Sequence, residues 1–210
     1  MLNVKHILWD VDGTLYEYTP QYMKEIKGKI YETFSKKLGV TLQRAKTIFD
    51  RELKILGAGT EVFLKHNLDP SLAIEAINSV DKKRVLKREP SLLNMLKNTL
   101  KNYDHIIVTS TTRKDVLNTL KILGIPKSTF SLIITLDDVA LTKPRPEPYL
   151  KVLQFTKDKP EKHVSVGDSE KRDAIPAKNL GMKTVIVGKK SKIADYSIES
   201  IYDLPKVLIT

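Results

Sequence analysis

The chain has 210 residues, a length that allows either one compact domain or a core that carries a large insertion. Its 36 Lys and Arg residues outnumber its 25 Asp and Glu residues, and the resulting formal charge of +11 favours anionic partners such as phosphorylated metabolites. Because the sequence contains no cysteine, disulfide bonds, thiol nucleophiles and cysteine metal sites are excluded.

The first predicted element is a buried strand over residues 4–9. This apolar-rich run leads directly into the acidic loop of residues 10–14. The start of the chain therefore lacks the long apolar stretch of a secretory signal, and no other segment is apolar over a length that spans a bilayer. We expect a cytoplasmic protein that has no membrane partner.

Residues 20–87 differ in character from the rest of the chain. They are rich in Lys, Glu, Leu and Ile at helical spacing, with breaks near Gly39, at residues 57–59 and at Asp69-Pro70. This pattern predicts about four helices and no strand. We therefore predict an inserted all-helical domain over residues 18–88 and a core domain built from residues 1–17 and 89–210.

After Glu89-Pro90, strands and helices alternate to the end of the chain. The later strands are predicted at residues 104–109, 132–135, 163–166 and 183–187. Residues from Ser191 onward are predicted to pack a short strand or helix onto the sheet edge. The alternation predicts an α/β fold with a Rossmann-like, doubly wound parallel sheet, whose ligands bind beyond the carboxyl ends of the strands.

Candidate site residues fall at or beside these carboxyl ends. Asp10 and Asp12 follow the first strand two residues apart, and such a pair can divide nucleophilic and proton-transfer roles. Thr109 and Ser110 end the second strand, where a hydroxyl and backbone amides could hold a phosphoryl oxygen. As a purely structural alternative, Asp-x-Asp-Gly can form a turn, and Thr109-Ser110 can cap a helix.

Two further candidates come later in the sheet. Lys143, beside a Pro-rich helix start, is a cation suited to neutralising a phosphate, although it can equally be one of many surface lysines. Asp168 and Asp173 follow another apolar strand and offer the carboxylates that Mg²⁺ prefers, although Asp168-Ser169 can also cap a helix. The arrangement of all four groups in one parallel sheet favours the functional interpretation.

These residues carry a resemblance to a known family. The sequences Asp10-Val11-Asp12-Gly13-Thr14, Thr109, Lys143-Pro144 and Gly167-Asp168-Ser169 with Asp173 resemble the four motifs of the haloacid dehalogenase superfamily. The resemblance covers nearly the whole chain. The helical insertion after the first motif resembles the C1-type cap of phosphoglycolate phosphatases, β-phosphoglucomutases and pyrimidine 5′-nucleotidases.

The resemblance implies a Mg²⁺-dependent phosphatase that acts on small phosphomonoesters. In such an enzyme Asp10 would attack phosphorus to form an aspartyl phosphate. Asp12 would protonate the leaving oxygen and then activate the hydrolytic water. The acid at Asp12 favours phosphoryl transfer over dehalogenation, because a departing halide needs no proton.

The resemblance also implies roles for the other residues. Thr109 and the Ser110 amide would bind phosphoryl oxygens, and Lys143 would balance charge. Asp10, the Asp12 carbonyl and Asp168 would hold Mg²⁺, with Asp173 supporting the metal shell or Lys143. One departure is the Ser110-Thr111 pair, where many relatives carry Asn-Gly. In the helical insertion, we predict substrate contacts by Thr60 and Glu61, although the alternative is that this segment is only a helix end.

Two other functions stay open at this stage. A phosphomutase would use the same aspartyl phosphate but return the phosphoryl group to a sugar, and the motifs do not separate it from a phosphatase. A non-catalytic nucleic-acid- or protein-binding module is disfavoured by the intact acidic motifs. Nucleic acid is also the less favoured partner because the lysines are spread at helical spacing, as on solvated faces. The sequence sets neither the physiological substrate nor the oligomeric state.

Overall fold

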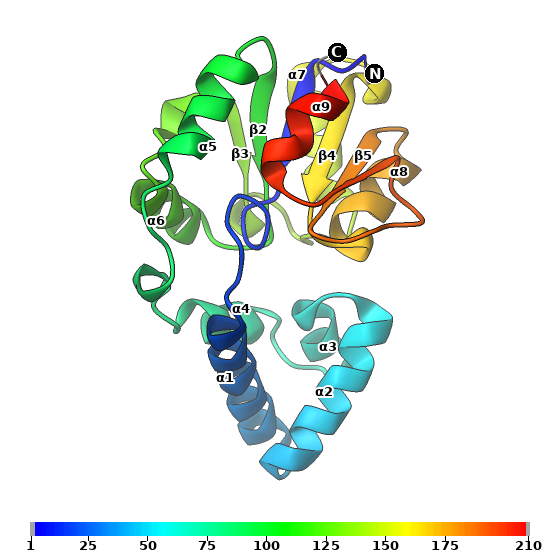
Figure 1. Cartoon of the computed structure of the whole chain (residues 1–210). Helices are drawn as coiled ribbons and strands as arrows, with labels where there is room; N and C mark the ends of the chain where they lie inside the picture. The colour runs from blue at the N-terminus through cyan, green and yellow to red at the C-terminus, as the bar shows by residue number, and fades with distance from the viewer. Residues whose placement is uncertain (1–2, 209–210) are drawn as a thin grey trace. The chain divides into compact units, whose positions relative to one another are not determined.

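The structure, a computed structural model, describes residues 3–208. Its described residues divide into two compact units, one of residues 3–17 and 86–208 and the other of residues 18–85. The first unit contains the sheet, and the second is helical (Figure 1).

A parallel sheet forms the centre of the first unit. Its strands among the described residues are β1 His6–Trp9, β2 Asp104–Val108, β3 Leu132–Ile134, β4 His163–Gly167, β5 Lys183–Val187 and β6 Tyr196–Ile198. The strand order is β3-β2-β1-β4-β5-β6, and every neighbouring pair is parallel. This order confirms the predicted doubly wound α/β fold. It also places the carboxyl ends of β1 and β4 side by side, where the strand order reverses.

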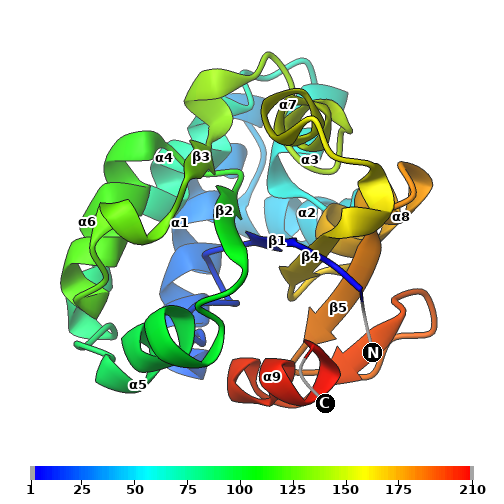
Figure 2. The ribbon, with the colours of Figure 1, turned by 90° about the horizontal axis from the view of Figure 1, so that it is seen from above.

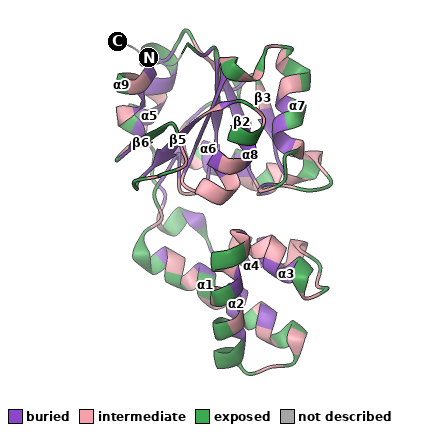
Figure 3. Ribbon diagram, turned by 90° about the vertical axis from the view of Figure 1, so that its right-hand side faces the viewer, coloured by how far each residue is buried: buried purple, intermediate pink, exposed green. Residues whose placement is uncertain are grey.

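Helices cover both faces of this sheet. They are α5 Pro90–Asn94, α6 Arg113–Leu123, α7 Glu147–Thr156, α8 Ile175–Asn179 and α9 Leu204–Leu208. Figure 2 shows α7 and α8 on one side of the strands and α5, α6 and α9 on the other. Alternate strand residues, such as Leu8 and Ile106, pack against Tyr149 of α7 and Ala177 of α8. Strands β1 to β5 are largely buried on both faces (Figure 3), as parallel strands usually are, whereas two of the three residues of the edge strand β6 are exposed.

Some of these elements differ in detail from the predicted ones. The end of the chain forms both the edge strand β6 and the helix α9, where a short strand or helix was expected. Two π-helical turns, Met95–Thr99 and Glu170–Ala174, continue into or out of short α-helices in the described part of the chain. Periodicity did not predict them, because one widened turn hardly changes an apolar pattern.

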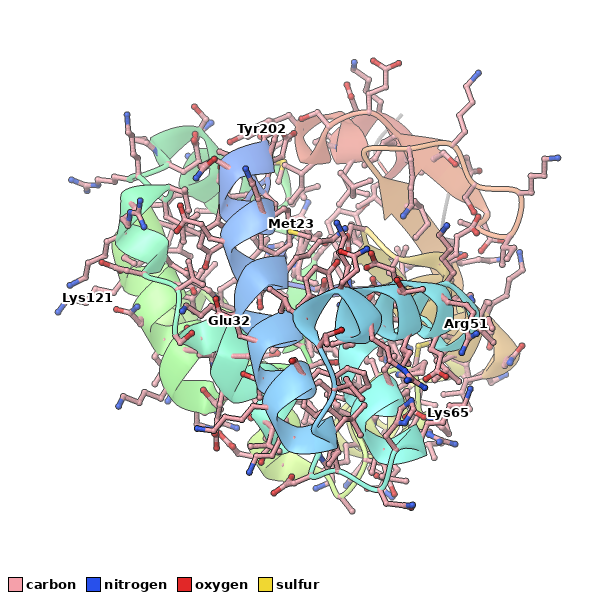
Figure 4. The ribbon with its side chains drawn as sticks, turned by 90° about the horizontal axis from the view of Figure 1, so that it is seen from below. Met23, Glu32, Arg51, Lys65, Lys121 and Tyr202 are labelled. Atoms are coloured by element: carbon pink, nitrogen blue, oxygen red, sulfur yellow. The ribbon has the colours of Figure 1, made fainter. Side chains whose placement is uncertain are left out.

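The helical unit contains α1 Pro20–Leu38, α2 Leu42–Leu56, α3 Gly59–Lys65 and α4 Ser71–Asn78. Gly39 and Gly57 end α1 and α2 with φ angles of 65° and 84°, a left-handed conformation that glycine adopts without a steric penalty. Phe34, Phe49 and Phe63 pack together in its core. Figure 4 shows the charged side chains on its surface. That this helical unit serves as a cap for the active site stays a prediction. In the described residues, no helix combines the length and apolarity that a bilayer crossing needs.

Candidate active site

Asp10 lies directly beyond β1, at the point where the strand order reverses. Its backbone N–H donates to Val166 O of β4 at 2.9 Å, so the sheet pairing continues to this residue. Its carboxylate is buried, with Lys143 Nζ donating to Oδ1 at 2.8 Å and Thr14 Oγ1 donating to Oδ2 at 3.4 Å. The carboxylate is therefore held in one orientation by residues from two loops.

Lys143 links Asp10 to a second carboxylate. Its side chain is only 2% exposed, so it is not one of the surface lysines that the sequence left as an alternative. Nζ also donates to Asp173 Oδ1 at 2.6 Å, and Asp173 Oδ2 accepts the Ser169 N–H at 3.0 Å. Gly167 makes room for this carboxylate, because an added Cβ would lie 2.2 Å from Asp173 Cγ. The buried ammonium group thus has a fixed position between two carboxylates.

Three carboxylates gather at this end of the sheet. Asp10, Asp168 and Asp173 each offer an oxygen, and these oxygens lie within 4.8 Å of one another. Carboxylate oxygens are the ligands that Mg²⁺ prefers, so the donor set fits this ion. Both oxygens of Asp173 accept close hydrogen bonds, from Lys143 and Ser169, whereas the bond that Asp10 Oδ2 accepts is long, at 3.4 Å, so Asp10 and Asp168 are the better candidates to hold it. Asp168 also accepts a hydrogen bond from Arg172 at 3.0 Å.

The electrostatics of the cluster also favour a cation. Burial raises the pKa of Asp10 to about 7, although Lys143 opposes this shift. Burial likewise raises the pKa of Asp168. For Lys143, burial would lower the pKa, but the attraction of Asp10 and Asp173 outweighs it, so the pKa is raised and the ammonium stays charged. A bound metal ion would favour the ionised form of these carboxylates.

Asp12 lies outside this carboxylate cluster. The chain turns after Asp10, with the N–H groups of Thr14 and Leu15 donating to Val11 O, and Gly13 takes a φ of 85°. The Asp12 carboxylate accepts a hydrogen bond from the Tyr16 hydroxyl. The turn therefore gives Asp10 and Asp12 separate surroundings. The sequence motifs did not predict the Tyr16 contact, although the spacing of four residues between Asp12 and Tyr16 is a signal for it.

The predicted phosphoryl-binding residues follow β2. Thr109 is buried, and its N–H donates to Ile134 O of β3 at 3.0 Å, so this amide is already used by the sheet. Ser110 Oγ accepts from Thr142 Oγ1 at 3.0 Å, which brings it beside the loop that carries Lys143. Neither residue caps α6, because the N-cap is Thr112. Of the two predicted phosphoryl-binding residues, Ser110 is thus the one with a hydrogen bond to the loop that carries Lys143.

Thr60 and Glu61 belong to the helical unit. They lie in the first turn of α3, which begins at Gly59 after the N-cap Ala58, and Gly57 closes α2. The segment therefore has the structure of two successive helix ends, which was the alternative interpretation. Contact of either residue with a substrate stays a prediction.

The chain is similar to several known proteins. A family model described as haloacid dehalogenase-like hydrolase matches residues 7–187, a range that includes Asp10, Lys143 and Asp168. Pyrophosphatase PpaX of Bacillus mycoides is 25% identical over 236 aligned residues, which cover 99% of this chain and 98% of that protein. Pyrophosphatase PpaX of Halalkalibacterium halodurans is 38% identical over 90 residues, which cover 43% of this chain and 41% of that protein.

Solved structures show the same fold. A HAD phosphatase from Thermococcus onnurineus is 29% identical with a TM-score of 0.63, and the alignment covers 98% of each chain. A protein from Thermotoga maritima, whose assignment as a β-phosphoglucomutase is itself an inference, has a TM-score of 0.63 at 21% identity, with 98% of each chain covered. At that identity the second likeness concerns the fold alone.

Proposed function

The chain belongs to the haloacid dehalogenase-like hydrolase family, and from this premise we propose that it is a Mg²⁺-dependent phosphatase that hydrolyses small phosphomonoesters. The observation that carries the proposal is the buried contact of Lys143 with both Asp10 and Asp173, at the carboxyl ends of β1 and β4. This contact places a fixed cation next to a carboxylate that can act as a nucleophile.

In the first step, a carboxylate oxygen of Asp10 attacks phosphorus. A bond between this oxygen and phosphorus forms, and the bond from phosphorus to the leaving oxygen breaks. Asp12, in its separate surroundings beside Tyr16, donates the proton that the leaving oxygen takes up. Lys143 balances the negative charge of the aspartyl phosphate.

In the second step, water attacks the aspartyl phosphate. Asp12, now ionised, accepts the proton of this water, and the bond from phosphorus to the Asp10 oxygen breaks. The sum is one phosphomonoester and one water converted to an alcohol and inorganic phosphate. Thr109 and the amide of Ser110 would orient the phosphoryl oxygens during both steps.

Mg²⁺ fits the site because Asp10 and Asp168 offer carboxylate oxygens next to the place of attack. When bound, the ion supplies positive charge to the phosphoryl oxygens and favours the ionised nucleophile. Asp173 keeps Lys143 in position beside Asp10.

The substrate is a small phosphorylated metabolite. Two bacterial relatives carry the name pyrophosphatase, so inorganic pyrophosphate belongs in the substrate panel beside nucleoside monophosphates, phosphoglycolate and sugar phosphates. A sugar-phosphate mutase would keep its phosphoenzyme from water. Steady release of inorganic phosphate from a simple monoester would therefore argue against that alternative.

The test is phosphate release from this panel with and without Mg²⁺. We expect EDTA to abolish turnover and Asp168→Ala to raise the Mg²⁺ concentration needed for half-maximal rate, because a metal ligand is lost. We expect Asp10→Asn to lower kcat by more than about 10³-fold, because an amide is a poor nucleophile. The control Asp104→Asn makes the same change at the amino end of β2. This end of the strands lies opposite the carboxyl ends that carry Asp10, so the variant should keep wild-type turnover. Full activity after exhaustive chelation, or in Asp10→Asn, would refute the proposal.

A further inference from the structure

Asp173 lies in the π-helical turn Glu170–Ala174, between β4 and α8. Both Asp173 N and Ala174 N approach Ser169 O, at 2.8 and 3.4 Å, and Ile175 N donates to Glu170 O five residues back. Such widened turns leave some carbonyl groups without their usual helical donors, and they occur often at functional sites. Some carbonyl groups of such a turn can therefore accept hydrogen bonds from groups outside it.

Pro176, in the first turn of α8, removes one of these donors. In an α-helix the amide of residue 176 would donate to the carbonyl of Arg172, four residues back. Proline has no amide hydrogen, so it cannot make this bond. A buried carbonyl that lacks a donor destabilises the fold. A donor from outside the helix can therefore take the position of that amide at Arg172 O.

The hydroxyl of Tyr149 takes the place of that amide. It donates to Arg172 O at 3.0 Å and lies 3.4 Å from Asp173 O. The ring is 1% exposed and packs in the apolar layer beneath α7 and α8, so the hydroxyl is held in place. Ser165 of β4 donates to Asp173 O at 2.9 Å. Two side-chain hydroxyls thus fix the backbone on either side of the Asp173 side chain.

We infer that Tyr149 is a positioning residue, whose hydroxyl replaces the amide missing at Pro176 and so aligns Asp173 with Lys143. This inference rests on the proposed function, because only in the proposed phosphatase reaction does the contact between Lys143 and Asp10 have a catalytic role. The chain of contacts runs from Tyr149 to the Arg172 carbonyl and from there along the backbone to Asp173. Asp173 then meets Lys143 at 2.6 Å, and Lys143 meets Asp10 at 2.8 Å.

The first test is Tyr149→Phe, which removes only the hydroxyl. We expect kcat to fall about tenfold, because a small shift of a charged group lowers the rate even when the changed residue is remote from the chemistry. KM should stay within about twofold, because the residues that meet the rest of the substrate are unchanged. Tyr103→Phe is the matched control. Its hydroxyl also donates to a main-chain carbonyl, Leu208 O at 3.1 Å, and it precedes β2 at the amino end of the sheet, so kcat should not change.

The second test restores the missing amide. In the variant Tyr149→Phe/Pro176→Ala, the N–H of residue 176 can donate to Arg172 O. We expect kcat to return to within about threefold of the wild type, whereas Pro176→Ala alone should stay within about twofold. A residue that only fills space would give no such rescue. Urea unfolding of the four proteins should show the same coupling, with Tyr149→Phe less destabilising when residue 176 is Ala.

The outcomes separate the two proposals. If the wild type releases no phosphate from any phosphorylated substrate, the proposed function fails, and the unfolding measurements still test the Tyr149 bond. If the wild type is active but Tyr149→Phe keeps full kcat, or the double variant is no better than Tyr149→Phe, the positioning role is wrong. Should Tyr149→Phe not fold, the double variant Tyr149→Phe/Pro176→Ala decides, because the restored amide is expected to restore folding and a kcat within about threefold of the wild type. A double variant that also fails to fold would then overturn the inference.

Discussion

At the scale of single residues, Asp12 is the acid that transfers the proton in the proposed mechanism. It is partly exposed and bonded to the Tyr16 hydroxyl, whereas Asp10 is buried against Lys143. We predict that Asp12→Asn slows phosphorylation by alkyl phosphates about 10²- to 10⁴-fold, because an amide cannot supply a proton to the leaving oxygen. Aryl phosphates should lose much less in this step, because their leaving groups need little protonation.

Rapid-mixing kinetics would measure this difference, since the burst of released alcohol or phenol reports phosphorylation and steady turnover reports hydrolysis. The hydrolysis step should slow for both substrate classes, because both pass through the same aspartyl phosphate. Equal losses for alkyl and aryl esters in the burst would contradict the assignment of Asp12 as the proton donor.

A substitution at Gly167 would test how tightly the cluster of Asp10, Lys143 and Asp173 is packed. A Cβ at this position would lie 2.2 Å from Asp173 Cγ, so the carboxylate would have to move away from Lys143. We predict that Gly167→Ala lowers kcat about 10²-fold and the free energy of unfolding by about 1–3 kcal/mol. Gly28→Ala in α1 is the control, because an added Cβ there meets nothing within 4 Å. It should leave kcat on a small aryl phosphate unchanged and stabilise the helix slightly. Equal effects of the two changes would refute this reasoning.

Residue patterns indicated the charged residues that the structure brings together, but not the residues that hold them in place. Asp10, Lys143 and Asp168 carry their chemistry in their residue types, and the topology of a parallel sheet brings such loops together. The part played by Tyr149 is different, because a buried tyrosine at helical spacing has the pattern of any core residue. Its contact depends on the missing amide of Pro176, which matters only once the backbone of the intervening turn is known.

At the scale of elements, the glycine and proline breaks predicted the helix ends well. Gly39 and Gly57 do end α1 and α2, and the strand after Pro90 begins at Asp104 as expected. The π-helical turn Glu170–Ala174 was not predicted, because it differs from an α-turn in hydrogen bonding and hardly in pattern. No sequence pattern indicated that one glutamate of α2 is buried.

That glutamate, Glu52, ties α2 to the end of α3. Its side chain is 5% exposed and contacts Lys65 at 3.1 Å and His66 at 2.8 Å; Lys65 is labelled in Figure 4. Burial alone would raise the pKa of Glu52, but the hydrogen bonds from Lys65 and His66 outweigh it, so the pKa is lowered. We predict that Glu52→Gln lowers the free energy of unfolding at pH 7 by about 1–3 kcal/mol, because the buried acceptor loses the charge that strengthens its hydrogen bonds from Lys65 and His66.

The lowered pKa of Glu52 also predicts how its contribution to the free energy of unfolding changes with pH. A lowered folded-state pKa means that the stabilisation by Glu52 is present above the unfolded-state pKa of about 4.3 and is lost as the pH falls through the folded-state value. The difference between Glu52→Gln and the wild type should therefore shrink at acidic pH. Urea unfolding followed by far-UV circular dichroism at several pH values would measure it. Glu75→Gln, at an exposed position of α4, should have little effect at any pH. A difference that does not depend on pH would show that charge is not the cause.

At the scale of the whole molecule, the sequence predicted the fold class because each strand and helix agrees with the doubly wound order. It predicted less about the substrate, because specificity depends on side chains that surround the leaving group rather than on the motifs. The formal charge is the one whole-chain property that bears on any phosphorylated substrate. An excess of 36 basic over 25 acidic residues, +11 in all, produces a potential that attracts anions from solution.

The last prediction follows from this charge. We expect kcat/KM for a phosphomonoester to fall about threefold or more between about 0.05 and 0.5 M KCl at saturating Mg²⁺, because salt screens the attraction of distant charges. The value of kcat should change less than about twofold, because the buried contacts of Lys143 are screened little. The double variant Lys101→Glu/Lys127→Glu changes two exposed residues that precede β2 and β3, at the end of the sheet opposite Asp10, and lowers the formal charge from +11 to 11 − 4 = +7. It should lower kcat/KM at low salt and match the wild type at high salt. If kcat/KM responds neither to salt nor to this variant, the positive charge of the chain does not draw the substrate to the site.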